Sequence, residues 1–144
     1  MGHLKVWVLA PALDNPDPNL SYYYDFSQSI AEYTSVFTSL NIPWKWQPVS
    51  LDDYKDIIQE IVADSAGGNY FPLVLNLCDG DEINGAPGIS VIKALEFENI
   101  VYTGAAFDFY EITTSKIPMK KAFDKAGIPT PKLVAINDKK FNAE

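Results

Sequence analysis

The chain has 144 residues, of which 47% are hydrophobic, enough for one compact core and too few for two ordinary domains. Its formal net charge of -8, with eleven lysines and no arginine, argues against nucleic acid as a partner, because phosphate neutralisation needs a clustered basic face. No apolar run is long enough to cross a bilayer, and the lone cysteine, Cys78, excludes an intrachain disulfide and fits a reducing cytoplasm.

The first third of the chain alternates between strand and helix patterns. Residues 4–9 form a short apolar run that predicts a buried strand. Apolar residues then recur at spacings of three and four, which is typical of an amphipathic helix. These residues are Tyr22, Phe26, Ile30, Tyr33, Phe37 and Leu40. Trp44 and Trp46 alternate with polar neighbours, as expected for a second strand.

A second helix is predicted between two clear signals. Ser50 and Asp53 resemble a capping box at its start, and Gly67 with Gly68 marks its end. The expected buried face consists of Tyr54, Ile57, Ile58, Ile61 and Val62. Residues 73–77 follow as the most apolar strand of the chain.

The remaining elements continue the alternation. A glycine-rich loop leads to a predicted helix at 89–97, a short strand at 100–103 and a last helix at 117–126, which Gly127 ends. Strands that alternate with helices favour parallel crossovers, so we expect an open, parallel, Rossmann-like α/β sheet with helices on both faces.

The domain organisation follows from this pattern. We expect residues 1–136 to form one Rossmann-like domain, and residues 137–144 to begin a linker or a truncated next domain. Ligands of open parallel sheets bind beyond the carboxyl ends of the strands. The three loops expected at that edge are 10–21, 78–88 and 104–115.

The loop after the third strand carries the most suggestive chemistry. Its acidic and amide side chains are Asp79, Asp81, Glu82 and Asn84. Such a set suits an amino group or a metal better than an anion. Gly80 and Gly85 have the glycine spacing of a phosphate-binding P-loop, but Ala86 and Pro87 stand where Lys and Ser or Thr are required. The segment 82–88 echoes a magnesium-binding carboxylate and amide pair but lacks a second acidic segment, so no metal ligand is assigned.

The second half of the chain resembles a known family. The segments that carry the resemblance are "VLNLCDG", "IKALEFENIVYTGA", "AGIPTPKLVAI", and the pair Ser115 and Lys116 with Lys120 one turn later. In this order and spacing, residues 74–136 look like the amino-terminal domain of ATP-grasp ligases related to D-alanine–D-alanine ligase. The resemblance implies a cytoplasmic enzyme that joins a carboxylate to an amine through an acyl phosphate, with ATP and Mg²⁺ as cofactors.

The resemblance also implies particular roles. Lys116 falls on the lysine that reaches the nucleotide phosphates, whereas Asp79, Gly80, Tyr102 and Gly104 are the candidates for substrate binding. No catalytic residue is assigned. The expected partners are a small carboxylate, a small amine, the missing ATP-grasp domains and a second copy of the chain in a homodimer, with no nucleic acid and no membrane. Without those domains we expect this piece to be inactive and to hold no cofactor tightly.

Two departures leave the substrates open. The segment 10–21, "APALDNPDPNLS", stands where the family has a glycine-rich turn that contains Ser and Glu. The carboxylate site of the first substrate is therefore unassigned. Cys78 and Asp79 stand where D-alanine–D-alanine ligases have His-Gly, and Cys78 is expected to be a small buried residue.

Two alternatives to the ligase function are a stand-alone α/β binding domain and a response-regulator-like domain with Asp79 as phosphoacceptor. A reading frame that continues past Glu144 would favour the ligase fragment over the stand-alone domain.

Overall fold

The computed structural model describes residues 3–13 and 24–133. The elements are β1 (His3–Pro11), α2 (Ser27–Ser39), β2 (Trp44–Val49), α3 (Tyr54–Ala66), β3 (Tyr70–Asn76), α4 (Ile89–Phe97), β4 (Val101–Tyr102), α5 (Phe107–Thr113) and α6 (Lys116–Lys125). The chain divides into two compact units, Met1–Phe107 and Asp108–Glu144. The domain boundary predicted at residue 136 lies outside the described residues.

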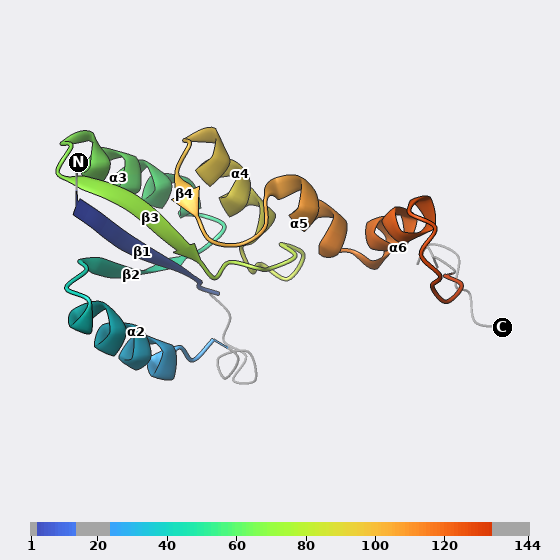
Figure 1. Cartoon of the computed structure of the whole chain (residues 1–144), viewed down its shortest axis with the longest axis horizontal. Coiled ribbons are helices and arrows are strands. Elements are labelled where there is room, and N and C mark those ends of the chain that lie inside the picture. The colour runs from blue at the N-terminus through green and yellow to red at the C-terminus, as the bar shows by residue number, and fades with distance from the viewer. Residues whose placement is uncertain (1–2, 14–23, 134–144) are drawn as a thin grey trace. The chain divides into compact units, whose positions relative to one another are not determined.

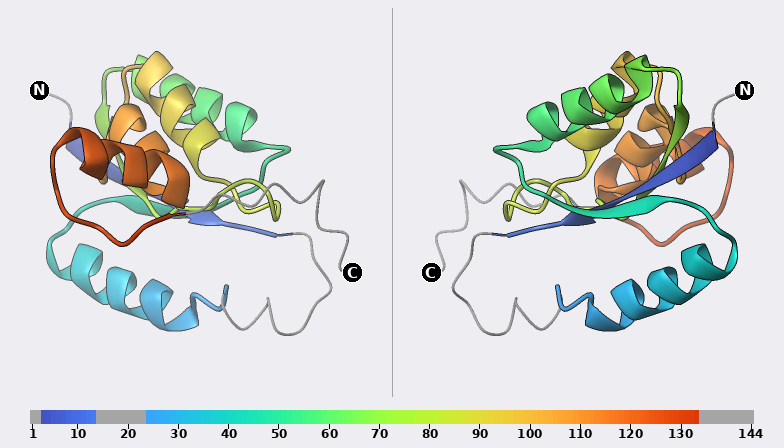
Figure 2. Two further views of the ribbon diagram at one scale, coloured as in Figure 1. Left: turned by 90° about the vertical axis from the view of Figure 1, so that its right-hand side faces the viewer. Right: turned by 90° about the vertical axis from the view of Figure 1, so that its left-hand side faces the viewer.

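The first unit contains a four-stranded sheet in the order β2-β1-β3-β4, and every pair of neighbouring strands is parallel. Helix α2 covers one face of the sheet, and α3 and α4 cover the other (Figures 1 and 2). The predicted open parallel α/β fold with helices on both faces is therefore confirmed. From β1 the chain goes first to β2 on one side and then to β3 on the other, so the strand order reverses between β1 and β3.

Strand β1 is the centre of the sheet. Val8 lies opposite Trp46 of β2 and Leu75 of β3, and both Val8 and Leu9 are completely buried. A parallel strand with neighbours on both sides and helices on both faces is expected to be continuously apolar, as residues 6–11 of this strand are. Its observed ends lie beyond the predicted range 4–9, because pairing with β3 starts at His3 and pairing with β2 continues to Pro11.

The main core lies between the sheet and helices α3 and α4. Its buried residues are Trp7, Leu9, Val49, Ile57, Ile58, Ile61, Val74, Cys78, Val91, Leu95 and Ile100. Before α3, the Ser50 amide donates to Asp53 Oδ1 at 2.7 Å, but Asp53 itself is the residue directly before the helix and its side chain caps no helix amide, so the predicted pair shapes the turn and does not cap the helix. The helix ends before Gly67, and Gly68 has a φ of +68°, as the two glycines predicted.

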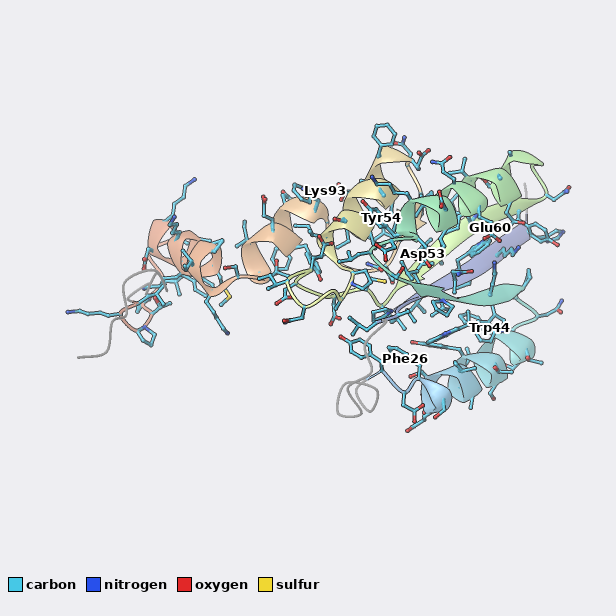
Figure 3. All side chains as sticks on the ribbon, turned by 180° about the vertical axis from the view of Figure 1, so that it is seen from behind. Phe26, Trp44, Asp53, Tyr54, Glu60 and Lys93 are labelled. Carbon is cyan, nitrogen blue, oxygen red and sulfur yellow. The ribbon has the colours of Figure 1, made fainter. Side chains whose placement is uncertain are left out.

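The opposite face is covered by aromatic contacts. No residue of α2 is fully buried. Instead, ring centroids are 5.4 Å apart for Phe26 and Trp46 and 5.4 Å apart for Phe37 and Trp44, while Tyr33 lies 6.2 Å from Trp46. In Figure 3, Phe26 and Trp44 lie on the α2 side of the sheet. The predicted stripe is only partly buried: Ile30 and Leu40 are exposed, and Tyr22 lies outside the described residues.

The prediction of a loop over residues 104–115 is wrong for its middle part, where the structure has helix α5. The Phe107 amide that starts α5 donates to Glu96 Oε1 at 3.0 Å. This carboxylate comes from α4, so no local capping residue announced the helix.

Helix α6 agrees closely with its prediction. It begins at Lys116 and stops before Gly127, whose φ is +68°. Lys120 Nζ contacts Asp124 Oδ1 at 2.7 Å and also the hydroxyl of Thr130, which ties the helix to the segment that follows it. Among the described residues, no helix combines the length and the apolar character that a membrane span requires.

Candidate functional site

A crevice opens where the strand order reverses, beyond the carboxyl ends of β1 and β3. It has a volume of about 850 Å³, within the range of ligand sites. Residues from the loops after both strands line it, including Leu13, Tyr24, Asp79, Gly80, Asp81 and Asn84. This is the position at which open parallel sheets bind their ligands. The crevice therefore contains Asp79 and Gly80, two of the predicted substrate-binding residues.

The loop after β3 folds back on itself to form one wall of the crevice. The Gly80 amide donates to the Pro87 carbonyl at 3.0 Å, and the Glu82 amide donates to the Ala86 carbonyl at 3.2 Å. A β-carbon on Gly80 would lie 2.1 Å from the Ala86 oxygen, so only glycine fits at this close approach. Gly80 thus has a structural role, and its contact with a ligand stays a prediction.

Glu82 is used within this loop. Its Oε1 accepts hydrogen bonds from the amides of Gly88, at 3.2 Å, and Ser90, at 2.6 Å, and its Oε2 accepts one from the Ser90 hydroxyl at 2.8 Å. These groups surround the start of α4, where a negative charge is favourable. The carboxylate of Glu82 therefore takes the place that an anionic ligand would otherwise occupy at this helix.

Asp79 and Asn84 differ from Glu82 because their side chains make no hydrogen bond or ion pair within the described part of the chain. Asp81 is intermediate: its Oδ1 accepts the amides of Ile83 at 3.0 Å and Asn84 at 3.4 Å, which shapes the turn. Both Asp79 and Asn84 are exposed at the crevice wall. A carboxylate and an amide oxygen on the wall of one crevice suit a ligand ammonium group, which donates hydrogen bonds and carries the charge opposite to that of the carboxylate.

Cys78 lies directly beneath the crevice loop and is only 1% exposed. Its Sγ is 3.9 Å from the Leu9 carbonyl oxygen. Burial, together with the adjacent negative charge of Asp79, raises the pKa of this thiol to about 12. The expectation that Cys78 is a small buried residue is confirmed, and the neutral thiol has no nucleophilic role at ordinary pH.

Tyr102 and Gly104 occupy the end of β4. The Tyr102 hydroxyl donates to Glu96 Oε1 at 2.7 Å, and this bond, with that from the Phe107 amide, lowers the pKa of Glu96. Gly104 has a φ of +113°, a conformation that other residues rarely adopt. Neither is among the described residues that line the crevice, so their role in substrate binding stays a prediction.

Lys116 belongs to the second unit and is the first residue of α6. Its exposed side chain makes no hydrogen bond or ion pair with any described residue, whereas Lys120 is occupied by Asp124 and Thr130. Of Lys116 and Lys120, Lys116 thus has the ammonium available for a ligand. Across the described residues, no three His, Cys, Asp or Glu side chains are grouped to hold a metal ion. Asp14 and Asp17, in the first predicted loop, lie outside the described part.

Comparisons with known proteins add no identification. No protein-family model, curated protein or solved structure matches the chain.

A second cavity, of about 470 Å³, lies beside the crevice and was not predicted. Phe26, Ile30 and Trp46 line it, and it shares Leu13 and Tyr24 with the crevice. The alternation of β2 already indicated that Trp44 and Trp46 point to one face, but the sequence did not indicate what packs there. The shared walls make the two cavities neighbouring parts of one region.

Proposed function

We propose that this chain is the substrate-binding amino-terminal domain of a cytoplasmic, ATP-dependent carboxylate–amine ligase that resembles D-alanine–D-alanine ligase. The observation that carries the proposal is the free carboxylate of Asp79 in a crevice at the strand-order reversal. The segment "VLNLCDG" runs along β3 into this crevice, so the resemblance and the geometry coincide. Asp79 would hold the ammonium group of an amino-acid substrate.

The nucleotide part of the proposal concerns Lys116. An unpartnered ammonium at the first residue of a helix is suited to phosphate oxygens, because the helix start also attracts anions. In the complete enzyme, ATP and Mg²⁺ supply the activation of the substrate carboxylate as an acyl phosphate. Lys116 would orient the phosphates and balance their charge, and ATP-grasp domains outside this chain would provide the remaining contacts.

The proposal also includes a homodimer, which sedimentation equilibrium can test.

The experiment that tests the proposal is ATP-dependent ligation by the complete enzyme with Asp79→Asn. The amide keeps the size of the side chain and removes its charge, so the KM for the amino-acid substrate should rise by about tenfold or more, whereas the KM for ATP should change little. The matched control is Asp52→Asn, because Asp52 is also exposed and makes no hydrogen bond or ion pair with described residues. Absence of ligation with any amino acid, or an unchanged KM in Asp79→Asn, would contradict the proposal.

A response-regulator-like function is the second candidate. The strand order β2-β1-β3-β4 agrees with the flavodoxin-like order of such domains, and Asp79 is exposed after β3. Incubation of the chain with acetyl phosphate and Mg²⁺, followed by intact-mass analysis, separates the two functions. Addition of one phosphoryl group, lost in Asp79→Asn, would support the regulator and overturn the ligase.

A further inference from the structure

Among the described residues, the cavity beside α2 has apolar walls formed by Phe26, Ile30 and Trp46. Trp46 and Ile30 are not fully buried, although both face this cavity, and Ile30 is 37% exposed. Large aromatic and aliphatic side chains gain free energy when they leave water. An apolar group that entered this cavity would complete the burial of these walls.

The aromatic side chains have a defined arrangement around the opening. The Phe26 and Trp46 rings are 5.4 Å apart with an angle of 53° between their planes, and the Tyr24 and Phe26 rings are 6.4 Å apart at 63°. Tilted and edge-on arrangements are preferred between aromatic rings, so these contacts hold the wall in place and leave ring surface for a further aromatic group. The volume of about 470 Å³ is large enough for such a group.

The crevice and the cavity meet at Leu13 and Tyr24, which line both. We propose that the amino-acid substrate of this site has a large apolar side chain, preferably aromatic. Its ammonium group binds at Asp79 in the crevice, and its side chain enters the cavity between Phe26, Ile30 and Trp46. This inference rests on the proposed function, because it takes the crevice as the substrate site.

Asp25, which also lines the cavity, distinguishes substrate side chains by their charge. Its Oδ1 accepts the Ser27 amide at 3.0 Å, and this hydrogen bond lowers the pKa of the Asp25 carboxyl group. An exposed aspartate is ionised at neutral pH even at its ordinary pKa, and its negative charge at the cavity wall disfavours a negatively charged side chain. Amino acids with acidic side chains should accordingly bind more weakly than those with uncharged apolar side chains.

The test measures the binding of phenylalanine, alanine, glutamate and 3-phenylpropionate to the chain itself. Calorimetry gives the affinities, and changes in amide chemical shifts locate the site. Both enantiomers of each chiral amino acid are used. Phenylalanine should bind about tenfold or more tightly than alanine, because only its side chain removes apolar surface from water. It should also bind more tightly than 3-phenylpropionate, which lacks the amine. Glutamate should bind no better than alanine.

A pair of variants locates the side-chain site. Ile30→Trp places a bulky indole ring in the cavity, in place of an aliphatic side chain, and should abolish the preference for phenylalanine over alanine. Val36→Trp makes the same kind of change at a position of α2 that is 48% exposed and does not line the cavity, so the preference should persist. Circular dichroism checks that both variants fold, and the ligand series on the unmodified chain does not depend on either variant.

The results distinguish this inference from the proposed function. Equal affinities for phenylalanine and alanine, or no binding of either, would overturn the inference, as would a preference that survives in folded Ile30→Trp. If the complete enzyme ligates small amino acids as well as large ones, the proposed function holds and the side-chain assignment fails. If the chain selects phenylalanine but the complete enzyme forms no ATP-dependent product, the binding site stands and the ligase function is wrong.

Discussion

Lysines of the same helix have different surroundings, and this difference makes the role of Lys116 testable. Lys116 is exposed and unpartnered among the described residues, whereas Lys120 bonds to Asp124 and Thr130. Lys125, in the last turn, is exposed like Lys116 and lies at the end of the helix that repels anions. It is therefore the better control for removal of a surface charge.

In the complete enzyme, Lys116→Ala should lower turnover by roughly one to three powers of ten and raise the ATP requirement, because charge on the transferring phosphoryl group loses a preorganised partner. Lys125→Ala should have little effect, and Lys116→Arg should restore activity only partly, since a planar guanidinium replaces a compact ammonium poorly. Steady-state kinetics at varied ATP measures all three. Unchanged turnover and ATP dependence in Lys116→Ala would contradict this role and show that Lys116 is a solvated surface lysine.

Cys78 is the clearest case of a side chain whose chemistry is changed by its surroundings. Burial and the charge of Asp79 raise its pKa from 9.0 to about 12. Alkylation requires the thiolate, so iodoacetamide near pH 8 should modify the folded chain about a thousandfold more slowly than the unfolded chain. Mass spectrometry with and without urea measures the ratio. Rapid modification of the folded chain would show that the crevice loop opens readily.

The loop between β3 and α4 depends on the close approach of its two arms at Gly80. Gly80→Ala places a methyl group 2.1 Å from the Ala86 oxygen, so the arms must separate and their hydrogen bonds weaken. The free energy of unfolding should fall by about 2 kcal/mol or more. Gly67→Ala is the matched control, because a β-carbon there would lie 3.7 Å from Asn69 Nδ2, an ordinary contact, and the φ of Gly67 is -71°.

In Gly67→Ala the change should be within about 1 kcal/mol and can be stabilising. Urea unfolding followed by circular dichroism compares the two variants. Equal stabilities would mean that the loop rearranges without cost. Loss of ligand binding in a folded Gly80→Ala chain would in addition link the loop geometry to the crevice.

The two units differ in how much of their surface is buried. Helices α3 and α4 of the first unit each contain three fully buried residues, whereas neither α5 nor α6 contains any. Local opening is easiest where few apolar side chains are buried. Backbone amides of residues 116–125 should therefore exchange with deuterium faster than those of β1 and α3. Hydrogen exchange by mass spectrometry tests this, and equal protection of the two regions would contradict it.

Much of the fold follows from local pattern. The spacing of Ile57, Ile58 and Ile61 predicted which face of α3 is buried, and Gly127 predicted where α6 ends, because helical period and left-handed turns are properties of neighbouring residues. Helix α5 was missed because its first amide is satisfied by Glu96, a residue of another helix. Local patterns carry no information about such partners.

The candidate site divides in the same way. Asp79 and Gly80 could be placed at the binding edge from sequence, since any loop that follows a parallel strand at its carboxyl end lies there. Leu13 falls in the loop 10–21 that was expected at the same edge, but Tyr24 and Trp46 could not be assigned to the site, because their proximity to it depends on β1 lying between β2 and β3. Periodicity and turn residues act over a few positions of the chain, whereas strand order is decided by how whole faces are buried against one another. The sequence therefore determined every element but α5 and the edge of the candidate site, and the tertiary structure determined which side chains meet there.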